Sequence, residues 1–166
     1  TIPPQTSTIA SHLPKAVGAA YSLGLVRRRP PEHRALAEDG IILCSFGDAS
    51  ANHSTAQGAF NTAAWTSYQS IPLPLLFVCE DNGIGISTKT PKGWIAASHA
   101  HRPGVKYFAA DGLDLFETFA LASEAADYVR NRRKPAFLHL RTVRLYGHAG
   151  ADMPTTYMPR EEVEAE

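Results

Sequence analysis

The sequence has few cysteines and no long apolar run. Cys44 and Cys79 are the two cysteines among 166 residues, and each lies inside a short apolar stretch. Two isolated cysteines provide neither a disulfide framework nor a metal-binding spacing, so we expect buried thiols that pack as small apolar groups. No apolar run reaches the roughly 18 residues of a membrane helix, and residues 1–4 lack the features of a signal peptide. We therefore expect no membrane contact and a reducing, cytoplasmic location.

The sequence also lacks an excess of either charge. Its 16 Lys and Arg residues balance 16 Asp and Glu residues. A neutral chain has no overall field that attracts nucleic acid, so we expect no nucleic-acid partner. The hydrophobic share of 44% is enough for a core, and the length suits one domain over residues 1–166. Because the chain starts without Met and stops in an acidic stretch, we expect a piece of a longer protein.

Helical and strand-like segments alternate along the chain. Apolar residues recur at helical spacing over residues 11–29, 56–64 and 114–130. Residues 41–46 and 75–79 are nearly unbroken apolar runs, typical of buried strands, and residues 137–143 are predicted to form the last strand. A further short strand is predicted near residues 105–108, and the arginines at 27–29 are predicted to be a solvated helix end. This alternation predicts an α/β fold, a mostly parallel sheet with helices on both faces.

Two segments carry more specific predictions. Residues 114–130 place Asp114 at a helix N-cap and put a single apolar stripe along the helix, formed by Leu115, Phe119, Ala122, Ala126 and Val129. Residues 81–104 are rich in Gly, Pro, Ser and Thr and predict a long loop, poorly ordered over residues 89–102 for want of apolar anchors. His99 and His101 lack the further ligands of a zinc site and are predicted to be exposed.

Polar residues follow two of the predicted strands. The two segments are Gly47-Asp48-Ala49-Ser50 and Asp81-Asn82-Gly83-Ile84. Ligands of parallel sheets bind beyond the carboxyl ends of strands, and a helix start after Ser50 would attract a phosphate. The Asp48 carboxylate would repel that phosphate unless a cation lay between them, and Mg²⁺ takes carboxylate, amide and phosphate oxygens. Asp48 and Asn82 are therefore candidate magnesium ligands, although each segment taken alone also suits a simple turn.

These segments carry a family resemblance. Gly47-Asp48 followed by Asp81-Asn82 resembles the thiamine diphosphate motif that is usually written GDG…NN. Residues 11–20, 59–64, 82–88, 144–148 and 160–162 resemble the α subunit of 2-oxo acid dehydrogenase E1 enzymes, more closely the branched-chain type than the pyruvate type. The resemblance runs along nearly the whole chain in one order. It implies the thiamine diphosphate-binding fold.

The resemblance also implies a site, a reaction and partners. The cofactors would be thiamine diphosphate and Mg²⁺; the metal ligands would be Asp48, Asn82 and the Ile84 carbonyl, and the cofactor-binding residues Gly47, Asp48, Ala49, Ser50, Asn82 and His148. His148 would be the catalytic histidine beside the reacting carbonyl. The reaction would be oxidative decarboxylation of a 2-oxo acid, with acyl transfer to a lipoyl-bearing E2 component. An E1 β-type subunit or domain would supply the activating glutamate, so this chain alone is expected to be inactive.

Some features depart from the family pattern and leave alternatives open. Ala49 stands where the motif has its second glycine, and Asp81 where it has its first asparagine. Another thiamine diphosphate enzyme of transketolase type, or a non-catalytic pairing module of the same fold, would also suit the sequence. A dinucleotide-binding domain is a weaker alternative, because Gly83-Ile84-Gly85 starts a G-x-G-x-x-G pattern that Thr88 interrupts.

Overall fold

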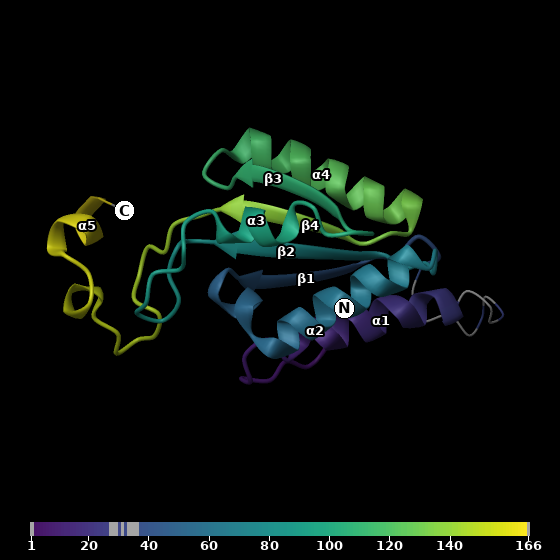
Figure 1. Ribbon diagram of the computed structural model, residues 1–166, viewed down its shortest axis with the longest axis horizontal. Helices are drawn as coiled ribbons and strands as arrows, with labels where there is room; N and C mark the ends of the chain where they lie inside the picture. Colours follow the sequence, from purple (N-terminus) through teal and green to yellow (C-terminus); the bar gives the residue numbers. More distant parts are fainter. Residues whose placement is uncertain (1, 27–29, 31, 33–36, 166) are drawn as a thin grey trace.

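A four-stranded sheet forms the centre of the molecule. The computed structural model describes residues 2–26, 30, 32 and 37–165. Its sheet has the order β1-β2-β4-β3, with β1 at Ile42–Gly47, β2 at Leu75–Asp81, β3 at Lys106–Asp111 and β4 at Ala136–Arg141. All three pairings are parallel, as Figure 1 shows. The predicted α/β fold is confirmed, with strand ends shifted by a few residues.

Helices cover both faces of this sheet (Figure 1). Helices α1 (His12–Val26), α2 (Ser54–Tyr68) and the short α3 (Trp94–His99) lie on one face, and α4 (Leu115–Arg132) lies on the other. The chain ends in the short η3 (Pro154–Thr156) and α5 (Arg160–Ala165). The predicted arginine end of the first helix, at residues 27–29, lies outside the described residues. Among those described, no helix combines the length and hydropathy needed to span a membrane.

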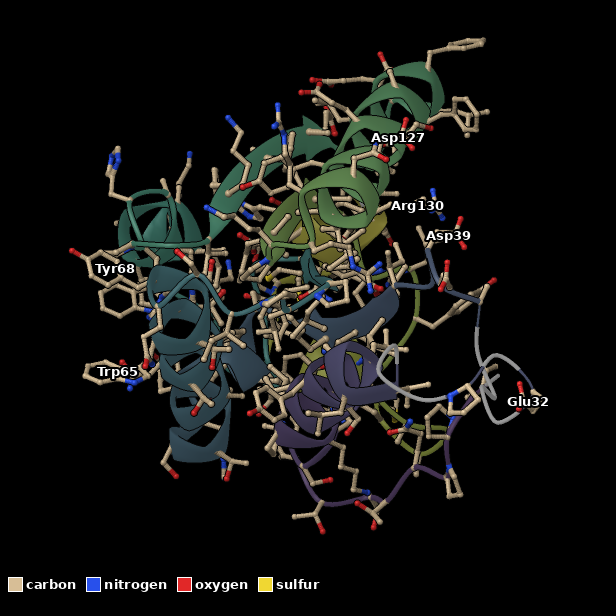
Figure 2. The ribbon with its side chains drawn as sticks, turned by 90° about the vertical axis from the view of Figure 1, so that its right-hand side faces the viewer. Glu32, Asp39, Trp65, Tyr68, Asp127 and Arg130 are labelled. Carbon is tan, nitrogen blue, oxygen red and sulfur yellow. The ribbon has the colours of Figure 1, made fainter. Side chains whose placement is uncertain are left out.

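An aromatic core lies between α2 and the sheet. Phe60 of α2 meets Phe77 of β2 edge to face, with ring centroids 5.0 Å apart, and Phe46 and Phe137 surround the pair. Both cysteines are buried and free, as predicted, and burial raises the pKa of the Cys44 thiol to about 11. The opposite side of α2 exposes Trp65 and Tyr68, which point away from the sheet in Figure 2.

Helix α3 replaces part of the predicted long loop. Ile95 is 3% exposed and His99 is 1% exposed. The His99 ring stacks on Phe137 at 4.4 Å and meets Phe60 edge to face at 4.8 Å. Burial lowers the pKa of His99 to about 4, so the ring is neutral in the core. The predictions of a weakly anchored segment and of an exposed His99 are wrong, because Ile95 and His99 are buried in the core. Trp94 and Arg102, on either side of them, also donate hydrogen bonds to Asn52 and Gln57. His101 is exposed, as predicted.

Ile95→Ala tests this anchor. We expect the substitution to lower the free energy of unfolding by about 2–5 kcal/mol, because it leaves a cavity beneath α3. Urea denaturation would measure the change. His101→Ala, at an exposed position two residues after His99, is the matched control and should change stability by no more than about 0.5 kcal/mol. Equal effects of the two substitutions would contradict the anchoring role.

Helix α4 packs on the sheet through a face that overlaps the predicted stripe only in part. Its N-cap is Asp114, whose carboxylate accepts the N–H groups of Phe116 and Glu117, as predicted. Leu115 and Phe119, however, are 75% and 72% exposed. The buried positions are Val129, which belongs to the predicted stripe, and Ala125, which does not; Leu121 and the predicted Ala122 pack against them. The contact face is therefore rotated away from Phe119. Near the far end, Arg130 forms exposed ion pairs with Asp39 at 3.6 Å and with Asp127 of the same helix at 3.5 Å (Figure 2).

Candidate functional site

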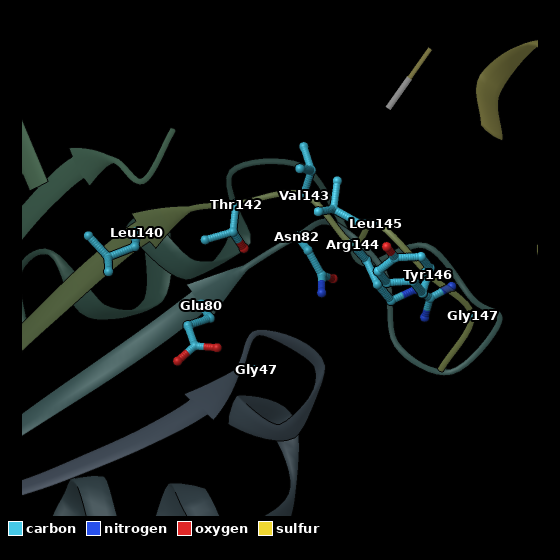
Figure 3. A pocket seen from close by; sticks show the side chains of 10 residues that line it. All are labelled: Gly47, Glu80, Asn82, Leu140, Thr142, Val143, Arg144, Leu145, Tyr146 and Gly147. Carbon is cyan, nitrogen blue, oxygen red and sulfur yellow. The ribbon is translucent and has the colours of Figure 1, made fainter. Parts of the chain in front are cut away.

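The parallel pairing of β1 and β2 brings the two polar segments to one edge of the sheet. Gly47, the last residue of β1, is in register with Glu80 of β2. The Asp48 N–H donates a long hydrogen bond of 3.4 Å to the Glu80 carbonyl. Asp48 and Asn82 therefore follow adjacent strands at the same edge, where Figure 3 shows Gly47, Glu80 and Asn82.

Asp48 is a buried carboxylate. It is 2% exposed, and one of its oxygens accepts a hydrogen bond from the Thr90 hydroxyl. Burial raises the pKa of Asp48 despite this bond, and the nearby Asp81 charge adds to the rise. Over the described part of the chain, no Lys, Arg or His forms an ion pair with Asp48. A buried anion without a cationic partner is a place where a metal ion would compensate the charge.

The segment after β2 forms a tight turn and a bridge. The Asn82 side-chain oxygen accepts the Ile84 N–H at 3.1 Å, and Gly83 takes a φ of +74°, which suits glycine. Ile84 and Lys89 then form an antiparallel bridge. Its hydrogen bonds run from Thr90 N–H to the Gly83 carbonyl at 2.9 Å and from Gly85 N–H to the Thr88 carbonyl at 2.8 Å. This bridge brings Thr90 back to Asp48 and leaves the Ile84 carbonyl outside its hydrogen bonds.

These groups fit a magnesium ion by their chemistry. Within the described ranges no group of three or more His, Cys, Asp or Glu side chains could hold a metal. The candidate ligands at this edge are instead one carboxylate, one amide and one backbone carbonyl. The Asn82 oxygen keeps a second lone pair besides the one that accepts from Ile84. A set of so few protein oxygens suits Mg²⁺, which usually completes its shell with water and phosphate oxygens.

The sequence predicts that a helix starts directly after Ser50, but in the structure the α-helix starts later. Ala49–Asn52 form a 3₁₀ turn, η2, and α2 starts at Ser54 with His53 as its N-cap. The loop after β2 passes close to this turn, because a Cβ added at Gly85 would lie 3.3 Å from the Ala49 Cβ. Ala49, which replaces the second glycine of the family motif, therefore lies opposite Gly85, where the lack of a side chain leaves room for the Ala49 methyl group. Ser50 is half-buried in the same turn.

An open cavity of about 630 Å³ lies beside this edge (Figure 3). Its lining consists of Gly47, Glu80, Asn82, Leu140, Thr142, Val143, Arg144, Leu145, Tyr146 and Gly147. Glu80 faces it and accepts a hydrogen bond from the Ser45 hydroxyl at 2.5 Å. Of the predicted site residues, Gly47 and Asn82 line this cavity. Asp48 is buried and is not part of the lining, and His148 directly follows the lining residue Gly147.

Hydrogen bonds connect the loop that carries His148 to the segment after β2 that contains Gly85. The His148 side chain is exposed, and its backbone N–H donates to the Asp152 carboxylate at 2.6 Å. The same carboxylate accepts the Tyr157 hydroxyl at 2.7 Å, and this bond is the main cause of the lowered pKa of Asp152. Arg144 donates to Tyr157 at 2.7 Å and to the Gly85 carbonyl at 2.7 Å. One hydrogen-bonded chain therefore joins the segment on either side of His148 to the turn after β2.

Thr90, Asp152 and Tyr157 were not predicted. Thr90 contacts Asp48 across 42 positions of the sequence, and no spacing rule marks such a pair. Asp152 and Tyr157 lie in a region without helical or strand periodicity. A polar residue four positions after His148 is the single local signal that sequence reasoning could have used.

Comparison with known proteins gives consistent matches. A family model described as dehydrogenase E1 component matches residues 4–166. The chain is 30% identical over 161 residues to 2-oxoisovalerate dehydrogenase subunit alpha, mitochondrial, of Mus musculus, covering 95% of this chain and 33% of that protein. It is 30% identical over 159 residues to the pyruvate dehydrogenase E1 component subunit alpha of Zymomonas mobilis, covering 93% and 40%. The chain thus spans well under half the length of these relatives.

A solved structure supports the fold alone. A transketolase from Leishmania mexicana superposes with a TM-score of 0.58 at 15% identity, covering 82% of this chain and 20% of the transketolase chain. At this identity the likeness concerns the arrangement of strands and helices. It agrees with the parallel sheet described above.

Proposed function

Since this chain belongs to the dehydrogenase E1 component family, we propose that it forms the thiamine diphosphate and magnesium side of a 2-oxo acid dehydrogenase E1 enzyme. The observation that carries the proposal is the buried Asp48 carboxylate at the sheet edge that Asn82 shares, where none of the described Lys, Arg or His residues pairs with it. The whole enzyme would decarboxylate a 2-oxo acid and transfer the acyl group to a lipoyl-bearing E2 component. Thiamine diphosphate, when bound, supplies the electron sink for decarboxylation.

The residues of this chain would bind and orient the cofactor. Asp48 would supply the charge that balances Mg²⁺, and the Asn82 amide and Ile84 carbonyl would supply neutral oxygens. Gly47, Ala49 and Ser50 would contact the diphosphate at the turn after β1. His148 would lie at the cavity rim beside the reacting carbonyl, on a loop whose backbone Asp152 holds.

The partners and compartment belong to the same proposal. An E1 β-type subunit or domain would complete the site with its activating glutamate, and the chain alone would then be inactive. The cytoplasmic location stays a prediction that rests on the free thiols of Cys44 and Cys79. A transketolase-type enzyme or a pairing module are rival functions for the same fold.

The dinucleotide-binding alternative loses its structural basis. In that motif the glycines open a helix whose N-terminus binds the pyrophosphate. Here Gly83 and Gly85 lie in the bridge between Ile84 and Lys89, and the next helix, α3, starts at Trp94.

Calorimetric titration tests the proposed function. We expect thiamine diphosphate to bind the complete E1 assembly in the presence of Mg²⁺ and to bind much more weakly after a chelator removes the metal. Thiamine monophosphate, which lacks the second phosphate, is the matched control ligand and should bind weakly under both conditions. Absence of any binding by the complete assembly would refute the cofactor assignment and favour the pairing module.

A further inference from the structure

A hydrogen-bonded chain crosses three neighbouring strands toward the cofactor edge. The Tyr107 hydroxyl of β3 lies 2.6 Å from Nδ1 of His139 in β4. Nε2 of the same ring lies 2.8 Å from Oδ2 of Asp81, the last residue of β2. The other oxygen of Asp81 accepts the Gly83 N–H at 3.1 Å. Both carboxylate oxygens are thus engaged, one by the chain from Tyr107 and one by the turn that contains Asn82.

The chemistry of the three side chains constrains the directions of these hydrogen bonds. The Asp81 carboxylate can only accept, so Nε2 of His139 carries a hydrogen and donates it to Asp81. Burial raises the pKa of Tyr107 to about 12, so its hydroxyl keeps its hydrogen, and in the tautomer with its hydrogen on Nε2 the free Nδ1 accepts from that hydroxyl. Aromatic packing holds the His139 ring in place. Tyr107 stacks on Phe137 with ring centroids 6.0 Å apart, and the His139 ring is tilted against the Tyr107 ring with centroids 6.1 Å apart.

We propose that His139 is a positioning residue of the cofactor site, which together with Tyr107 holds the Asp81 carboxylate on the Gly83 amide. The Asp81 carbonyl is fixed as well, because it accepts the Thr142 N–H at 2.8 Å. With both ends of Asp81 fixed, the following turn presents the Asn82 oxygen and the Ile84 carbonyl at the edge near Asp48. The arrangement also keeps Asp81, a second carboxylate close to Asp48, out of the metal shell. This inference rests on the proposed function, because the turn matters to the cofactor only if the cofactor binds there.

The same series of hydrogen bonds, from Tyr107 through His139 to Asp81, explains how an aspartate at position 81 can hold the turn where the family motif has an asparagine. An asparagine at position 81 would accept from Gly83 with its oxygen and donate to His139 with its amide nitrogen. The ring would then carry its hydrogen on Nδ1 and donate to the Tyr107 oxygen. Histidine can adopt either tautomer, so Asp81→Asn should preserve the turn, whereas an apolar residue at position 139 should not.

The test compares variants of the complete E1 assembly. His139→Leu is expected to raise the Kd for thiamine diphosphate at fixed Mg²⁺ by about tenfold or more, the usual effect of losing a residue that orients a ligand. It should also speed hydrogen exchange at the Gly83 and Ile84 amides. His139→Gln, whose amide nitrogen can replace Nε2 as donor, and Asp81→Asn should both stay near wild type. Tyr107→Phe removes the hydroxyl and keeps the ring, and it should show the loss in weaker form even if His139→Leu fails to fold.

The control is His101→Leu, an exposed histidine removed outside this chain of contacts, which should leave Kd and exchange unchanged. A role in stability alone would lower the melting temperature of His139→Leu without altering the Mg²⁺ dependence of its Kd. Wild-type affinity and exchange in both His139→Leu and Tyr107→Phe would overturn the positioning role while leaving the proposed function intact. If wild type itself binds no thiamine diphosphate, the proposed function fails, and unchanged Gly83 exchange in the variants would then overturn the positioning role independently.

Discussion

Asp48→Ala is expected to abolish magnesium-dependent binding of thiamine diphosphate to the complete enzyme. Asp48 is the one carboxylate among the proposed protein ligands, and Mg²⁺ loses water reluctantly unless a few well-placed oxygens replace it. Asn82→Ala should weaken binding by less, because it removes a neutral oxygen. Asp48→Asn should fall between the two, since it keeps an oxygen and loses the charge. Calorimetry at several Mg²⁺ concentrations would rank the three variants.

The same position gives a control in the cofactor-free protein. Burial raises the pKa of Asp48 above its value in the unfolded chain, so the folded state binds the proton more tightly. The free energy of unfolding therefore falls as pH rises from the unfolded pKa, about 3.9, through the folded pKa. Asp48→Asn has no ionisable group at this position, so its free energy of unfolding should not fall in this way, and its amide oxygen still accepts from Thr90. The variant should therefore be more stable than wild type at neutral pH and about as stable as wild type near pH 4. Wild-type cofactor affinity in Asp48→Ala would reduce Asp48 to a turn residue.

His148→Ala should lower turnover of the complete enzyme by about 100-fold or more, the range for losing a group that assists proton transfer or orients the reacting carbonyl. Folding should be unaffected, because the His148 side chain is exposed and the bond to Asp152 uses the backbone N–H, which alanine retains. The measurement is kcat with a 2-oxo acid and a lipoyl acceptor, beside the melting temperature.

A second variant separates the side chain from its loop. Asp152→Asn weakens the acceptor that holds the His148 N–H and the Tyr157 hydroxyl, so it should lower turnover through loop position while His148 remains. His101→Ala supplies the exposed-histidine control. Unchanged kcat in His148→Ala would return that residue to an ordinary loop histidine.

The two strands that lead to the site were predictable from their apolar runs. Residues 75–79 lie within β2, and a strand buried on both faces needs apolar side chains at every position. Residues 41–46 overlap β1, although this edge strand leaves Leu43 61% exposed. Adjacency of Asp48 and Asn82 followed from the parallel order. Helix α3 was not predictable in this way, because a six-residue helix is too short to show a period, and a histidine that is neutral in an aromatic core looks polar in sequence.

The face of α4 shows a second limit. Its sequence offers several apolar stripes, and the sheet selects the one through Ala125 and Val129. Contacts such as Thr90 with Asp48 or His139 with Asp81 join positions that are distant in sequence. No local propensity encodes them, so the site could be placed at a sheet edge from sequence, while its supporting contacts required the structure.

The short bridge between Ile84 and Lys89 has a consequence for how a ligand would arrive. One end of this segment leaves β2, and the other leads through Thr90 into α3, whose His99 is stacked in the core. A segment fixed at both ends has little conformational entropy left to lose when a ligand docks. Cofactor capture at this edge should therefore resemble insertion into a preformed slot, with an association rate set by encounter and metal dehydration and not by the folding of a loop.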